Sequence, residues 1–155
     1  MHEITIKKIK FEINQINTLL ESYQDLLSKV ENEAPDLIEI AALASILHSF
    51  YNGIENVFQI ILKSIDNQII NASSWHKELL KLMTVPNTKR SVVLSLQTMY
   101  LLSQYLSFRH FYRHSYSFYL NWKEMKPLVL SLRNVWEDTS VEIKTFLKSL
   151  EIDDS

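Results

Sequence analysis

The chain has 155 residues, of which 46% are hydrophobic and 22% charged, and its net charge at neutral pH is −2. This length and apolar content predict one globular domain over residues 1–155 and exclude a disordered chain. Cysteine is absent, which excludes disulfides, thiolate metal sites and a cysteine nucleophile, and suits a reducing cytoplasm. No stretch approaches the roughly 20 apolar residues of a membrane span, so we expect no membrane partner.

Turn-forming residues are scarce: the sequence contains one glycine and three prolines. Sheet-rich folds of this length need many more tight turns, because each hairpin requires residues with special backbone angles. The composition therefore predicts an all-α fold. Because the segments between the apolar patterns are short, we expect an antiparallel helical bundle of four to five helices.

Two long helices are predicted in the first half of the chain. Apolar residues recur every three or four positions over 9–30, which places them on one face of a helix, and the pattern ends before Pro35. Asp36 is positioned to cap a second helix over 37–61. Gly53 lies inside that helix at a cost of about 1 kcal/mol relative to alanine, so we expect another backbone to approach closely there.

Three further helices are predicted in the second half. A short one covers 75–82, and a long one begins near Arg90 and extends to Arg109. The last helix begins at about Asn121, and Pro127 is expected to bend or delay its first turn.

The basic residues are unevenly distributed. A net charge of −2 gives no overall attraction to nucleic acid. Residues 105–134, however, contain five arginines and lysines against a single glutamate, Glu124. This local excess of positive charge makes an anionic partner plausible for that segment.

The densest group of reactive side chains lies at residues 109–116, with the sequence RHFYRHSY. One reading is a solvated helix end, where cations complement the helix dipole. Another is a metal site, because His110 and His114 share a helix face, but no third ligand is obvious. We therefore expect no metal and no cofactor.

A third reading of the same group is metal-free RNA cleavage. The substrate's own 2′-hydroxyl is the nucleophile, so the protein needs only a proton-transfer group such as His114 and an anion-binding group such as Arg109. On an unbroken helix these two residues would be about 140° apart. They can converge on one phosphate only if the helix ends or kinks near Arg113, or if a second subunit completes the site.

The arrangement Arg109-x4-His114-x-Tyr116 resembles the Arg-x4-His-x-Tyr motif of HepT toxins, within the wider arginine-histidine pattern of the HEPN superfamily. Segments 47–58 and 75–80 are also similar to HepT segments and occur in the same order. The resemblance covers about residues 37–125. One departure is His110, where the family often has asparagine or aspartate.

The resemblance implies a HEPN-like homodimer that cleaves RNA in a composite cleft at the subunit interface, with Arg109 and His114 as catalytic residues. It also implies a type VII-like toxin–antitoxin pair, in which a minimal nucleotidyltransferase antitoxin adenylylates Tyr116. His110, Arg113 and Glu55 are candidate supporting residues, and Glu55 could orient the arginine through a salt bridge.

Two other functions remain open. Related helical proteins resemble non-catalytic, substrate-binding or regulatory partners of nucleotidyltransferases. A purely structural bundle subunit would account for the apolar stripes but not for the basic cluster. The presence of both Arg109 and His114 favours the enzyme.

Overall fold

The structure is a computed structural model that describes residues 1–116 and 119–153. Its helices are α1 (Glu3–Ser22), α2 (Gln24–Lys29), α3 (Leu37–Ser64), α4 (Trp75–Leu82), α5 (Leu96–Arg113) and α6 (Trp122–Asp153). Within those residues there is no strand, only an isolated bridge between Asn87 and Arg90. The predicted all-α class is confirmed.

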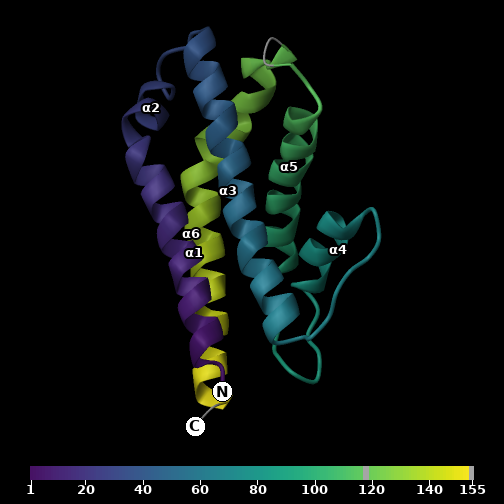
Figure 1. Cartoon of the computed structure of the whole chain (residues 1–155). Coiled ribbons are helices and arrows are strands. Elements are labelled where there is room, and N and C mark those ends of the chain that lie inside the picture. Colours follow the sequence, from purple (N-terminus) through teal and green to yellow (C-terminus); the bar gives the residue numbers. More distant parts are fainter. Residues whose placement is uncertain (117–118, 154–155) are drawn as a thin grey trace.

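Helix α3 is the centre of the bundle. It contacts α1, α4, α5 and α6, and the long helices α1, α3, α5 and α6 alternate in direction (Figure 1). α3 alone among the described helices is long and apolar enough to cross a membrane. Phe50, Ile54 and Phe58 are nevertheless fully buried against its neighbours, as in the core helix of a globular bundle.

The first turn of α3 is fixed by a capping box. The Asp36 carboxylate accepts a hydrogen bond from the Glu39 N–H at 2.8 Å, and the Glu39 carboxylate accepts one from the Asp36 N–H at 3.1 Å. These two bonds satisfy donors that a helix start otherwise leaves unpaired. The capping role predicted for Asp36 is confirmed.

The first predicted helix is in fact two helices. Tyr23, with φ −112° and ψ 17°, interrupts the helix between α1 and α2. Leu20 and Leu27 are buried on either side of this break. The break involves a single residue, so the apolar spacing continues across it and does not reveal it.

Gly53 is approached by a side chain, not by a backbone as the sequence suggested. A Cβ atom at this position would lie 2.7 Å from Ile16 Cγ1 and 3.0 Å from Ile16 Cδ1. Contacts this short do not occur between unstrained carbon atoms. The missing side chain of Gly53 therefore makes room for Ile16 and lets α1 pack against α3.

The predicted start of the third long helix near Arg90 is wrong, because α5 begins at Leu96. The Arg90 guanidinium is instead buried against Asp66, with Nε 2.8 Å from Oδ1 and Nη2 3.1 Å from Oδ2. Arg90 Nη1 and Nη2 also donate to the carbonyls of Val85 and Leu82. These bonds hold the segment between α4 and α5 in a loop conformation. A helical backbone in this segment would break them.

Ser95 marks the start of α5. Its hydroxyl accepts a hydrogen bond from the Thr98 N–H at 3.1 Å. Glu142 of α6 accepts hydrogen bonds from the Ser95 N–H and from the Thr98 hydroxyl. Ser95 is thus both a helix cap and a connection to the last helix.

Pro127 does not delay the last helix. α6 begins at Trp122, and Asn121 Oδ1 accepts a hydrogen bond from the Lys123 N–H at 2.9 Å. Pro127 lies inside the helix. The start near Asn121 is confirmed; of the two effects expected of Pro127, the delay is wrong and the bend stays a prediction.

The contact at Gly53 predicts a substitution whose effect depends on its neighbour. Gly53→Ala should destabilise the protein by about 1–3 kcal/mol, because overcrowding Ile16 outweighs the gain in helix propensity. In an Ile16→Ala background the crowding atoms are gone, and the same change should be neutral or stabilising. Urea unfolding of the four proteins measures this difference; an equal effect in both backgrounds would contradict it.

Candidate active site

Helix α5 ends near Arg113, which is one of the arrangements that would allow Arg109 and His114 to converge on one phosphate. Its last residue is Arg113, and His114 follows with φ −115° and ψ 10°. The His114 N–H donates to the Phe111 carbonyl at 3.1 Å, which closes the final turn. The helix end near Arg113 is confirmed, and it frees His114 from the helical spacing that would separate it from Arg109.

A cleft of about 500 Å³ lies between α4 and α5. It is lined by Ser73, Ser74, His76, Lys77, Leu106, Ser107, Arg109, His110, Arg113 and His114. None of these ten residues is acidic, and six can carry positive charge. The cleft thus brings together Arg109, His114 and two of the candidate supporting residues, His110 and Arg113, and it suits an anionic ligand.

Arg109 is buried, with a relative exposure of 3%, and its guanidinium is held by α3. Nη1 donates to Asn52 Oδ1 at 2.8 Å, and Nη2 donates to Glu55 Oε2 at 3.0 Å. The salt bridge considered for Glu55 is therefore present. Tyr51 adds a cation–π contact, with its ring centroid 5.0 Å from the guanidinium carbon. These contacts fix Arg109 in position but occupy donors that the sequence assigned to a phosphate.

His76 joins the same network from α4. Its Nδ1 lies 2.8 Å from Glu55 Oε2 and 2.8 Å from Arg109 Nη2. The Trp75 ring packs against it at a tilt of 31°, with 3.6 Å between ring centroids. Sequence reasoning gave His76 no role, and spacing could not find one, because its partners are 21 and 33 residues away.

Asn52 extends the network to His48, which sequence reasoning also left without a role. Asn52 Oδ1 accepts from Arg109, so its amide Nδ2 is the donor to His48 Nε2, 3.1 Å away. Nε2 must then be the unprotonated nitrogen of a neutral ring. The pKa of His48 is lowered mainly by burial and, to a smaller extent, by the positive charges of Arg109 and Arg113. The lower pKa favours the neutral form of the ring.

The aromatic residues Tyr51 and Trp75 pack against the interior of the bundle. Tyr51 is fully buried. The pKa of its hydroxyl is raised mainly by this burial and, to a smaller extent, by the negative charge of Glu55. Trp75 is partly buried against the core. Both rings support the charged network from its apolar side.

The remaining predicted residues lie at the end of α5. The His110 ring is 4.8 Å from the His114 ring. Tyr116 is 71% exposed, and its ring is 6.5 Å from that of Tyr119. Between them the rings of His110 and His114 offer two nitrogen ligands on one side of the cleft, and residues 1–116 and 119–153 contain no group of three or more side chains suited to a metal ion.

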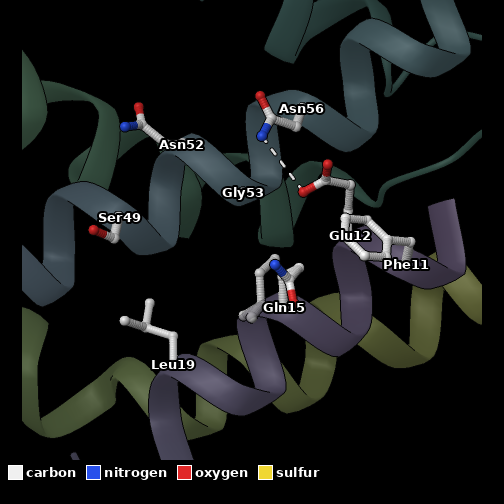
Figure 2. A pocket seen from close by; sticks show the side chains of 9 residues that line it. Phe11, Glu12, Gln15, Leu19, Ser49, Asn52, Gly53 and Asn56 are labelled. Carbon is white, nitrogen blue, oxygen red and sulfur yellow. Dashed lines mark hydrogen bonds between the residues drawn. The ribbon is translucent and has the colours of Figure 1, made fainter. Parts of the chain in front are cut away.

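A second, shallower groove lies between α1 and α3, where Gly53 allows the two helices to approach. Its volume is about 430 Å³, and Gln15, Ser49, Asn52 and Asn56 contribute polar groups to its lining. Figure 2 shows the Asn52 side chain directed away from α1, consistent with its hydrogen bond to Arg109. Asn52 therefore borders the groove on one side of α3 and supports the cleft on the other.

The all-α bundle, with Arg109 and His114 near the end of α5, is consistent with the HEPN-like class of helical domains. A family model described as "HepT-like protein" matches residues 42–150, so the chain belongs to the HepT-like protein family. No curated protein and no solved structure matches the chain.

The buried pair of Glu55 and Arg109 predicts strong energetic coupling. Both side chains are at most 7% exposed, so Glu55→Ala or Arg109→Ala leaves a buried charge without its partner and should cost about 3–5 kcal/mol. The double variant should cost clearly less than the sum of the single changes. Denaturant unfolding of the four proteins tests this, and additive losses would contradict the coupling.

Proposed function

We propose that this protein is a metal-independent RNA endonuclease, acting in the cytoplasm as the toxin of a type VII-like toxin–antitoxin pair. Its catalytic residues are Arg109 and His114, and two copies of the chain form a composite cleft at their interface. A minimal nucleotidyltransferase is the proposed antitoxin.

One observation carries this proposal: Arg109 and His114 line the same cleft, which has no acidic side chain among its lining residues. A phosphodiester entering it would meet His114 and the exposed cations Lys77 and Arg113. His114 is exposed, so its imidazole is accessible to a 2′-hydroxyl, and histidine can transfer protons near neutral pH.

Arg109 has a more internal part in this mechanism. Its charge is held at the wall of the cleft by Glu55 and Asn52, so it orients the site and adds positive potential to it. The exposed guanidinium of Arg113 is then the group best placed to take up a phosphate oxygen by two hydrogen bonds.

Control of the toxin is assigned to Tyr116. The exposure of this side chain makes its hydroxyl accessible to an antitoxin, which would transfer adenylate from ATP to the tyrosine oxygen and release pyrophosphate. Each added adenylate would place one negatively charged phosphate and a bulky nucleoside close to the end of α5. Both effects oppose binding of an RNA phosphate in the cleft.

A second candidate function is a non-catalytic partner that binds substrate for a nucleotidyltransferase. The burial of Arg109 favours this alternative, because a guanidinium engaged by Asn52, Glu55 and His76 can have a purely structural role. Loss of RNA cleavage on changing His114 alone would decide against it.

His114→Ala should reduce RNA cleavage by about 10²–10⁴-fold, because the proton-transfer group is removed while the fold keeps its buried contacts. Production of the wild-type protein alone should arrest growth, and the variant should relieve that arrest. His2→Ala, a histidine change at the start of α1, is the matched control. Equal toxicity and cleavage in wild type and His114→Ala would refute the nuclease assignment.

Co-production with a minimal nucleotidyltransferase should raise the intact mass of the protein by whole adenylate units. Tyr116→Phe should abolish this shift, because it removes the acceptor oxygen. Tyr100→Phe is the matched control, since Tyr100 is 62% exposed and Tyr116 71%. A shift that persists in Tyr116→Phe, or no shift in the wild type, would exclude Tyr116 as the modified residue.

A further inference from the structure

Cleavage of RNA by its own 2′-hydroxyl requires two proton transfers, and the proposed function assigns a residue to only one. A base removes the proton of the 2′-hydroxyl as the O2′–P bond forms, and an acid gives a proton to O5′ as the P–O5′ bond breaks. Arginine is a poor proton donor because its guanidinium stays charged. Each chain therefore supplies one proton-transfer group in His114, and the second must come either from the other copy in the composite cleft or from another side chain of the same chain.

His76 has the geometry for that second transfer. It lines the cleft opposite α5, and its side chain is 28% exposed. Its inner nitrogen, Nδ1, has an obligatory acceptor, Glu55 Oε2, and an obligatory donor, Arg109 Nη2, each at 2.8 Å. Nδ1 can donate to the first when protonated and accept from the second when not. The inner side of the ring is thus hydrogen bonded in either state, which leaves Nε2 to exchange a proton with a ligand.

The surroundings separate the roles of the two histidines. Glu55 provides a carboxylate in direct contact with His76, and it shares its Oε2 between His76 and Arg109. His114 lies beside Arg113 and His110, and no acidic residue lines the cleft. This arrangement suits His76 as the proton donor and His114 as the proton acceptor.

Building on the proposed function, we propose that His76 is a second catalytic residue, which protonates the departing 5′-oxygen. His114 takes the proton of the 2′-hydroxyl while the new O2′–P bond forms. His76 Nε2 gives its proton to O5′ as the P–O5′ bond breaks. The products are a 2′,3′-cyclic phosphate and a 5′-hydroxyl, and water returns the two histidines to their starting protonation states.

The charged and titratable groups around His76 bear on any pH dependence. Those in direct contact are Glu55 from α3 and Arg109 from α5. Those that line the same cleft are Lys77, His110, Arg113 and His114. His76 thus contacts one carboxylate, whereas the titratable groups that line the cleft around it are all basic.

A pair of RNA substrates tests the assignment. Digestion of total RNA by the wild-type protein first identifies a cleaved linkage. A short RNA containing that linkage is then made with oxygen or with sulfur at the 5′-bridging position. A thiolate leaves without being protonated, so the sulfur substrate does not need the acid. His76→Ala and His76→Gln should cleave the oxygen substrate about 10²–10⁴-fold more slowly and the sulfur substrate at nearly the wild-type rate.

The glutamine variant separates chemistry from positioning. Its amide can still hydrogen-bond to Glu55 but cannot transfer a proton, and it provides a folded protein if the alanine variant fails to fold. His114→Ala should be slow on both substrates, whereas Lys81→Ala, on the exposed side of α4, should match the wild type on both. Circular dichroism and thermal unfolding verify the fold of each variant.

Three outcomes would overturn the assignment. Wild-type rates for His76→Gln on the oxygen substrate would place the second proton transfer elsewhere, for example on a residue of a second copy. Equal slowing on both substrates would make His76 a positioning residue. If the wild-type protein cleaved neither RNA, the proposed function would be refuted, and the role of His76 with it.

Discussion

The ion pair between Arg109 and Glu55 is the interaction on which the site depends. It joins α5 to α3 in the interior of the bundle, where both side chains are nearly inaccessible to water. A buried charge is tolerated only when its partners are complete, and here Asn52, His76 and the ring of Tyr51 complete them. Because the buried guanidinium needs all of these partners, it fixes the positions of α3, α4 and α5 relative to one another. The cleft lies where these helices meet.

This arrangement divides the basic side chains of the cleft into two groups. Arg109 is anchored and serves as a fixed charge in its wall, whereas Lys77, Arg113 and His114 lie at its surface and can adjust to a ligand. The family match at residues 42–150 includes all of α4, α5 and the network residues of α3, but not α1 or α2. α1 instead packs on the far side of α3, at Gly53, where its contribution is to the core.

Periodicity in the sequence located most helices because each long helix buries a continuous stripe. The end of α5 near Arg113 was one of the alternatives that the chemistry expected of Arg109 and His114 left open. Two kinds of feature escaped it. The break at Tyr23 leaves the stripe intact, and the loop before α5 depends on a buried contact between Arg90 and Asp66, which are 24 residues apart. His76 was missed for the same reason: its role is defined by partners that only the folded chain brings together.

The contact between Arg90 and Asp66 has a consequence for α4. Asp66 lies directly after α3, in the segment that leads into α4, and Arg90 lies in the segment that leaves it. The ion pair therefore joins the segment that precedes α4 to the segment that follows it. Asn87 adds a second connection between these segments, because its side-chain amide also donates a hydrogen bond to Asp66. The position of α4, and with it that of His76, therefore depends on Asp66 and Arg90, although neither residue lines the cleft.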